Sequence, residues 1–257
     1  MQIYVCVKHV PDTAAKIIIS GNNRVDERVT FIMNPYDENA IEEAARIKND
    51  SGDAEVIAVT LGSQAAEATL QSALAMGADR GILIKTEEAP DSMMAAAALK
   101  AAIESDGKPG LIFTGKESID SEGFQTMYRL AAGFGIPAAS NVVSFSLGSD
   151  GAVAECEMEG GAREVVEMSL PCVIGAAKSL NKPTYPTLPA IMRARKKEIK
   201  QVDLRNLGFA KPAGRVETLD LKPAVEDRQP REIAGTPDEV AVEIVRILKE
   251  EARVLHD

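Results

Sequence analysis

Residues 111–128 read L-I-F-T-G-K-E-S-I-D-S-E-G-F-Q-T-M-Y, and this stretch decides the fold of the chain. It opens with a short apolar run of the kind that fills a parallel strand buried on both faces. Gly115 ends the run, and a polar segment follows as far as Gly123. Apolar residues then recur at helical spacing, at Phe124, Met127, Tyr128 and Ala131. The stretch therefore predicts a strand, a polar loop and a helix.

A strand, loop and helix of this kind can form a phosphate site. Ligands of open parallel sheets lie outside the carboxyl ends of the strands, where helix N-termini offer unpaired N–H groups. Gly115 would let the backbone approach a ligand closely, and side-chain donors follow at Lys116, Ser118, Ser121 and Thr126. The alternative is an ordinary solvated βα loop, because the chain has neither a Walker A nor a G-x-G-x-x-G motif.

The residues before this stretch alternate between the two periodicities. Strands are expected at residues 3–10, 54–61, 80–85 and 111–114. Helices are expected to begin at Asn34-Pro35, where Asn34 would cap the helix, at Ser63, at Asp91 and at Gly123. This order predicts an α/β fold with a Rossmann-like, doubly wound, mostly parallel sheet of the adenine-nucleotide-binding type.

The pattern changes after residue 134. Strand-like runs at 142–147, 152–158 and 164–170, separated by glycine-rich turns, predict an antiparallel extension of the sheet, and 173–177 returns as a buried strand. We expect a Rossmann-like domain over 1–197 and an extended C-terminal arm over 198–257. The arm ends in an amphipathic helix that begins with a capping box at Thr236 and docks either on its own domain or on a partner.

Composition narrows the possible functions. The 257 residues carry a net charge of −10, which argues against nucleic acid as the main partner. One basic cluster stands out: Arg193, Arg195, Lys196, Lys197 and Lys200. The three cysteines are expected to pack as small buried hydrophobes. No signal peptide is recognised, and no apolar run reaches the roughly 20 residues that span a membrane, so we expect a cytoplasmic, prokaryotic protein without membrane insertion.

Five stretches, taken together, resemble the β (small) subunit of electron transfer flavoproteins. They are Y-V-C-V-K-H-V at 4–10, M-N-P-Y-D at 33–37, A-L-A-M-G-A-D-R-G-I at 73–82, G-K-E-S-I-D at 115–120, and L-N-K-P-T-Y-P-T-L-P-A-I-M-R-A-R-K-K at 180–197. The resemblance implies an electron carrier without substrate turnover of its own. It also implies a heterodimer with a larger α subunit, whose mobile domain carries the redox-active FAD and on which the C-terminal helix would dock.

The resemblance further implies a second nucleotide in this chain, which is AMP in ordinary members and a second FAD in electron-bifurcating ones. Carried over by motif position, the nucleotide contacts would be Cys6, Asn34, Pro35, Tyr36, Asp37, Leu61, Gly115, Lys116, Ser118, Asp120, Ser121, Glu122, Gly123, Gln125 and Thr126. These positions agree with the pattern described above, because the end of the first strand, the helix start and the fourth βα loop all meet at one sheet edge.

Residues 187–197 resemble the family's docking segment for acyl-CoA dehydrogenases. The docking residues would be Leu188, Ile191, Met192, Arg193 and Lys196. An exposed leucine anchor with a charged rim suits a transient interface. The alternative is an ordinary surface helix whose apolar residues face the core.

Two departures from the family pattern and one match to it affect these expectations. Phe124 and Met127 stand at positions that are polar or glycine in the family, so the nucleotide stays open between AMP, which the docking segment favours, and FAD. G-A-A-K-S-L-N-K-P-T-Y at 175–185 replaces T-A-D-L-R-L-N-E-P-R-Y, so the partner contacts are expected to be specialised. Glu164 matches a glutamate of the family and is expected to anchor the flavin domain.

Two other functions compete with the electron carrier. A nucleotide-hydrolysing or adenylating enzyme would need a phosphate loop such as S-G-G-x-D-S, which the sequence lacks. A stand-alone nucleotide-sensing module would leave the segment beyond residue 180 unexplained. No metal-ligand spacing or catalytic triad is recognised, so no metal or catalytic residue is predicted. The expected partners are the α subunit, an acyl-CoA dehydrogenase or related flavoenzyme, and an oxidoreductase that passes electrons from the carrier to quinone.

Overall fold

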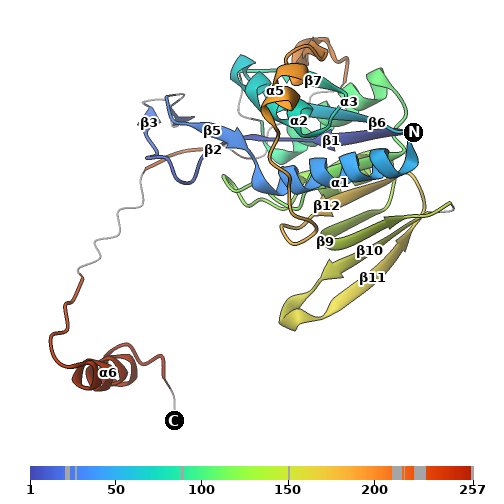
Figure 1. Ribbon diagram of the computed structural model, residues 1–257. Coiled ribbons are helices and arrows are strands. Elements are labelled where there is room, and N and C mark those ends of the chain that lie inside the picture. The colour runs from blue at the N-terminus through green and yellow to red at the C-terminus, as the bar shows by residue number, and fades with distance from the viewer. Residues whose placement is uncertain are drawn as a thin grey trace. The chain divides into compact units, whose positions relative to one another are not determined.

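A nine-stranded sheet forms the centre of the first of two compact units, Met1–Leu221 and Lys222–Asp257 (Figure 1). The computed structural model describes residues 1–20, 24–26, 28–87, 90–149, 151–209, 216, 218–222 and 230–255. From one edge to the other, the strands are β11 (Arg163–Met168), β10 (Ala152–Glu157), β9 (Ala138–Leu147), β12 (Cys172–Ala176), β8 (Leu111–Gly115), β1 (Gln2–Cys6), β6 (Glu55–Gly62), β7 (Arg80–Lys85) and β13 (Ile199–Asp203). All neighbours from β9 to β13 pair in parallel.

Helices cover both faces of the parallel strands, as the alternating pattern predicted. Alternate side chains of the strands divide the core into two clusters, because successive strand residues point to opposite faces. One cluster joins the sheet to α1 (Pro35–Ser51) and α2 (Glu67–Met76). The other joins it to α3 (Ser92–Asp106) and α4 (Thr126–Phe134). The short helix α5 (Leu188–Ala194) lies against α2, and its Ala194 is buried in the first cluster.

The antiparallel extension predicted after residue 134 is confirmed. β10 pairs antiparallel with both β9 and β11, and β9 returns to the parallel sheet by pairing with β12. The backbone N–H of Gly148 donates to the carbonyl of Gly151 in the first turn, and a short 3₁₀ turn, η2 (Glu159–Gly161), closes the second. All three cysteines are free and buried, as expected.

The first predicted strand, 3–10, is wrong in its second half. β1 ends at Cys6, and β2 (His9–Pro11) leaves the sheet to pair antiparallel with β5 (Phe31–Met33). The cause is the position of Lys8, whose backbone N–H donates to the Asp37 carboxylate at 2.7 Å instead of to a neighbouring strand. Beyond it, β3 (Ile19–Ser20) and β4 (Arg24–Val25) form a second small ribbon.

Three helix starts differ from expectation. Asn34 holds the cap position of α1, but its side chain makes no capping hydrogen bond. The segment after Ser63 begins with a 3₁₀ turn, η1 (Gln64–Ala66), before α2. The helix expected from Gly123 begins at Thr126, because Glu122 and Phe124 have φ values of 46° and 53°, in the left-handed region that a right-handed helix cannot contain.

The C-terminal boundary also differs from the expected one at residue 197. β13 continues the sheet beside β7, followed by a 3₁₀ turn, η3 (Leu204–Asn206), and the first unit extends to Leu221. The alternation of I-K-Q-V-D was too short to distinguish an edge strand from an arm. The second unit holds α6 (Pro237–Arg246) and a π-helical turn, η4 (Ile247–Glu251). Among the described residues, no helix is long and apolar enough to cross a bilayer.

Candidate functional site

The carboxyl ends of β1 and β8 meet the start of α1 at the buried carboxylate of Asp37. Its Oδ2 accepts from the Lys8 backbone N–H at 2.7 Å, and its Oδ1 accepts from the backbone N–H of Gly115 at 2.9 Å and from Asn34 Nδ2 at 3.0 Å. Asn34 extends this network by donating to the carbonyl of Glu117 at 2.8 Å and accepting from the N–H of Ile119 at 3.2 Å. One helix start therefore fixes the ends of two strands and the loop after β8.

Burial dominates the electrostatics of this network. It raises the pKa of Asp37 to about 7, although the N–H groups of Asn34, Lys8 and Gly115 and the charge of Lys8 oppose the rise. Burial, with a contribution from Asp37, likewise raises the pKa of the Cys6 thiol to about 12. Cys6 is therefore a protonated packing residue and no candidate for thiolate chemistry.

A second, more exposed set of contacts holds the loop after β8. Lys8 Nζ donates to Asp120 Oδ1 at 2.7 Å and to Ser118 Oγ at 3.1 Å, and the hydroxyls of Ser118 and Ser121 lie 2.9 Å apart. Burial opposes the ionisation of Asp120, but the charge and hydrogen bond of Lys8 outweigh it and lower the pKa. Exposed ion pairs contribute only about 0.2–1 kcal/mol, so this part of the loop can rearrange at small cost.

Lys116 lies between two aromatic rings at the base of the same loop. Its Nζ is 5.4 Å from the ring centroid of Tyr36 and 5.3 Å from that of Phe124, within the range of a cation–π contact. Phe124 keeps this position with a φ of 53°, which is unusual for a bulky residue. Phe124 thus has a structural role in holding the loop.

The first turn of α4 completes this edge. Gln125 occupies its cap position, but its Oε1 accepts from Arg129 Nη2 at 3.4 Å and makes no capping hydrogen bond, so the N–H groups of the turn have no side-chain cap. A hollow of about 360 Å³ also opens at this edge. It is lined by Tyr36, Lys116, Asn141, Glu157, Ala177, Lys178 and Ser179.

The predicted contact residues fall into two groups. Asn34, Asp37 and Gly115 are buried and bonded to one another. The other loop residues, from Lys116 to Thr126, are partly or fully exposed around this centre. Pro35 and Tyr36 open α1, and Leu61 lies partly buried near the end of β6.

Glu164, the expected flavin-domain anchor, lies exposed on the edge strand β11, in the antiparallel extension and not at the carboxyl-end edge.

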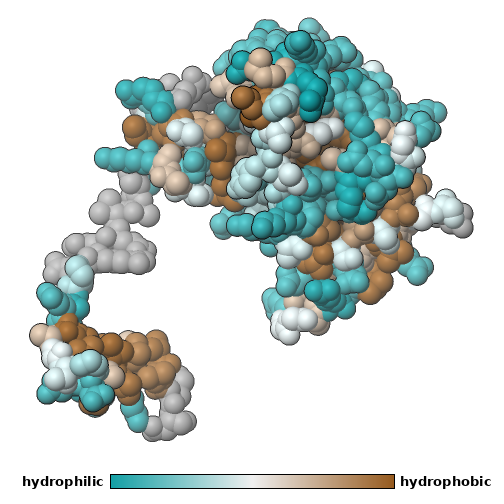
Figure 2. All heavy atoms as spheres, viewed as in Figure 1, coloured by the Kyte–Doolittle hydropathy of each residue, from teal (hydrophilic) through white to brown (hydrophobic). Residues whose placement is uncertain are grey.

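The docking residues predicted on α5 are exposed. The exposed fraction is 72% for Leu188, 50% for Met192 and 37% for Ile191, and apolar surface is visible on this helix in Figure 2. The alternative of a helix with core-facing apolar residues does not describe these three side chains, since only Ala194 of α5 is buried. Arg193 and Lys196 are exposed as well.

Sequence reasoning missed the polar contacts that hold the segment before α5. Asn39 Nδ2 donates to the Asn181 carbonyl at 2.9 Å, and Asn181 Nδ2 donates to the Asn39 carbonyl at 3.0 Å and to Glu43 Oε2 at 3.1 Å. Both Asn39 and Glu43 are buried polar residues. In the sequence, both stand among the apolar residues of α1, and this was the one available sign that they are buried. A buried polar side chain needs a hydrogen-bond partner, so contacts of this kind could have been expected.

The second unit contains an unpaired apolar surface. The capping box predicted at Thr236 is confirmed: its Oγ1 accepts from the Glu239 N–H, and Glu239 Oε2 accepts from the Thr236 N–H at 2.8 Å. No residue of α6 is buried, and Val242 is 71% exposed. Figure 2 shows the apolar side chains of this unit gathered together.

Comparisons with known proteins agree with this architecture. A family model, "Electron transfer flavoprotein domain", matches residues 23–207. Proteins described as "Electron transfer flavoprotein subunit beta" are 34% identical in Bacillus subtilis and 36% identical in Bradyrhizobium diazoefficiens, each over 99% of this chain and 100% of the relative. A protein of the same description from Mus musculus is 34% identical over 99% of both chains. The chain therefore belongs to the electron transfer flavoprotein family, as a β subunit with a role in electron transfer.

Proposed function

We propose that this chain binds AMP at the edge formed by Asp37, the loop after β8 and the start of α4. The observation that supports the proposal most strongly is that the end of β8, the start of α1 and the uncapped first turn of α4 meet at one edge, where Gly115 allows the first two to pack closely. A Cβ atom at this position would lie 2.5 Å from Asp37 Oδ1 and 2.6 Å from Tyr36 Cβ, so only glycine keeps the strand end and the helix start together. The uncapped first turn of α4 then offers N–H groups that suit a phosphate.

The chain functions as half of a heterodimer. The β designation of its relatives implies an α subunit, and the FAD that exchanges electrons would lie mainly on that subunit. The exposed apolar residues of α6 fit this role, because a helix without buried residues gains most of its stability by packing against another surface. We expect the chain expressed alone to aggregate and the α subunit to keep it in solution.

The electron donor would be an acyl-CoA dehydrogenase or a related flavoenzyme that binds α5. An exposed leucine flanked by basic side chains is a small apolar anchor with a charged rim, which supports fast encounter and release. The electrons would then pass to a quinone-reducing oxidoreductase. A donor of this class favours a non-bifurcating carrier, with AMP instead of a second FAD in this chain.

The nucleotide content of the complex tests the proposal. The heterodimer, purified without added nucleotide, is extracted with acid and the extract is separated by chromatography. One FAD and one AMP per heterodimer are expected. Two FAD per heterodimer would mean that a second flavin takes the place of AMP, and would make the complex a candidate for electron bifurcation. One FAD with no further nucleotide would mean that the edge around Gly115 binds no nucleotide.

A further inference from the structure

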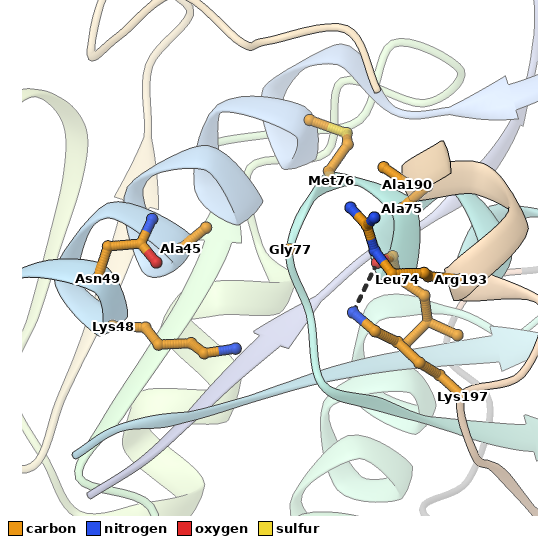
Figure 3. Close-up of a pocket in the computed structure, with 10 residues that line it drawn as sticks. All are labelled: Ala45, Lys48, Asn49, Leu74, Ala75, Met76, Gly77, Ala190, Arg193 and Lys197. Atoms are coloured by element: carbon orange, nitrogen blue, oxygen red, sulfur yellow. Dashed lines mark hydrogen bonds between the residues drawn. The ribbon is translucent and has the colours of Figure 1, made fainter. Parts of the chain in front are cut away.

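A hollow of about 240 Å³ lies beside α5 and carries an excess of positive charge. It is lined by Ala45, Lys48, Asn49, Leu74, Ala75, Met76, Gly77, Ala190, Arg193 and Lys197. These residues belong to the second half of α1, the end of α2, α5 and the turn after α5. Figure 3 shows the side chains of Lys48 and Lys197 reaching toward one another from opposite sides of the hollow, with the Arg193 guanidinium on the side of Lys197. No carboxylate is among the lining residues.

The three cations differ in how far they are neutralised. Lys48 pairs with Asp79. Lys197 donates to the carbonyls of Leu74 at 3.0 Å and Ala78 at 2.5 Å, at the C-terminal end of α2 where cations are favoured. Arg193 forms no side-chain hydrogen bond or ion pair with any residue that the structure describes. Three cations therefore share one carboxylate.

The cations also affect one another. Burial lowers the pKa of Lys197, and the positive charges of Lys48 and Arg193 lower it further, while Asp79 opposes the shift. An added carboxylate would relieve this repulsion and would offer the Arg193 fork a planar acceptor. A carboxylate-bearing side chain is thus the ligand that the charge and size of the hollow favour.

We propose that this hollow receives an acidic side chain of the partner flavoenzyme when that enzyme binds α5. The inference rests on the proposed docking role of α5 and adds a second, charged contact to it. Arg193 follows Met192 on the seven-residue helix that also carries Leu188 and Ile191, at about 100° from Met192 around the helix axis. A partner that covers the apolar anchor must therefore also reach around the side of α5 to fill the hollow. Interfaces commonly combine an apolar anchor with an arginine in this way.

The test compares two charge reversals in the purified heterodimer. Arg193→Glu changes a residue that lines the hollow, and Arg195→Glu makes the same change on an exposed residue outside it. Affinity is measured for each member of a panel of short-, medium- and long-chain acyl-CoA dehydrogenases. For the dehydrogenase that binds the wild type, Arg193→Glu should weaken binding by about 30-fold or more, as expected for a desolvated charge pair. Arg195→Glu should weaken it by at most about fivefold.

Rescue identifies the partner group. Each Asp and Glu around the partner's contact surface is changed to Lys in turn. One of these partner variants should bind the Arg193→Glu heterodimer at least tenfold more tightly than the unchanged partner does. The same change should not tighten binding to the Arg195→Glu heterodimer. Equal melting temperatures confirm that the variants fold. If Arg193→Glu does not fold, Arg193→Gln replaces it and should still weaken binding more than Arg195→Gln.

The outcomes separate this inference from the proposed function. If Leu188→Ala weakens binding while Arg193→Glu and Arg195→Glu behave alike, the hollow takes no acidic side chain and the docking role of α5 stands. If the wild type binds no dehydrogenase of the panel, both fall. If inorganic phosphate raises the melting temperature of the free wild-type heterodimer but not that of Arg193→Gln, the hollow is a site for a free anion, and the proposal is overturned.

Discussion

The nucleotide edge and the docking helix α5 differ in how many of their side chains are buried or hydrogen-bonded within the chain itself. At the nucleotide edge, the Asp37 carboxylate is buried and accepts three hydrogen bonds from N–H groups of the chain itself. On α5, Leu188 is 72% exposed, and Arg193 has no side-chain partner among the described residues. The first region is complete without another protein, whereas the second presents groups that only another molecule can cover.

This difference has a consequence for mutations. A change in the Asp37 network should cost stability, because buried polar groups lose partners that water cannot replace. A change on the exposed face of α5 should leave stability nearly intact and alter binding. The variants below test this separation and are ordered from the largest expected effect on stability to the smallest.

Gly115→Ala should have the largest effect. The new Cβ would lie 2.5 Å from Asp37 Oδ1 and 2.6 Å from Tyr36 Cβ, and neither atom can move without shifting the start of α1. We expect a loss of about 3 kcal/mol in the free energy of unfolding, measured with denaturant. Gly123→Ala is the matched control: a Cβ there meets no atom within 4 Å, so its effect should stay within about 0.5 kcal/mol. Equal effects at the two glycines would contradict the close packing described here.

Asp37→Asn should cost about 2 kcal/mol, because an amide N–H must face one of the N–H donors that the carboxylate now accepts. The cost should depend on pH. Burial raises the folded-state pKa of Asp37 to about 7, above its value in the unfolded chain, so the folded state holds a proton that the unfolded state has lost. The stabilising contribution is therefore full below about pH 4 and is lost as the pH rises through 7.

Denaturant unfolding of the wild type and of Asp37→Asn at several pH values checks this sign. The stability difference between the two proteins should narrow between about pH 4 and 8, because the variant lacks this titration. A difference that widens with pH would mean that the three N–H donors outweigh burial and lower the pKa.

Asn181→Ala tests the contact between the two regions. The change removes the amide that bonds to Asn39 and Glu43 and leaves Glu43 Oε2 without its partner, while Asn39 Nδ2 keeps its bonds to the carbonyls of Asn181 and Lys178. We expect a loss of about 1 kcal/mol. We also expect a larger loss in partner affinity than the change in stability explains, because the segment leading to α5 is then held to α1 by fewer contacts, among them those of Thr184 with Glu42. Lys182→Ala, on the exposed neighbouring residue, should change stability by less than about 0.5 kcal/mol. If both variants keep full affinity, the Asn39–Asn181 contact has no part in docking.

The parts of the fold that follow local rules could be predicted from the sequence. Apolar runs such as Leu111–Phe113 fill buried strands, and Thr236 forms the expected capping box, because both depend on residues close in the chain. The turn of the chain after Cys6 could not be predicted, since it depends on a carboxylate 29 residues away from Lys8. β13 was missed because I-K-Q-V-D contains only two apolar residues, unlike the apolar runs of β8 and β12, which have the same length.

The site was predictable as a set of segments but not as a network. Gly115 and the start of α1 were placed at one edge by the topology of parallel sheets. The role of Asn34 as a link to the loop, in place of a helix cap, follows only from the positions of Glu117 and Ile119. Asn39 and Asn181 are 142 residues apart, and their pairing carries no local signal.

Leu188→Ala should have the smallest effect on stability and tests the separation most directly. Melting temperature and dehydrogenase-dependent reduction of the flavin are measured on the same preparation of the heterodimer, at limiting enzyme concentration. The free energy of unfolding should change by less than about 0.5 kcal/mol, because the side chain is exposed. Partner affinity should fall about thirtyfold or more, as for the loss of a central anchor. The buried Leu130→Ala serves as the control and should cost about 2–5 kcal/mol. A large drop in melting temperature for Leu188→Ala, with electron transfer unchanged in the folded fraction, would make α5 part of the core and would contradict its role as a docking helix.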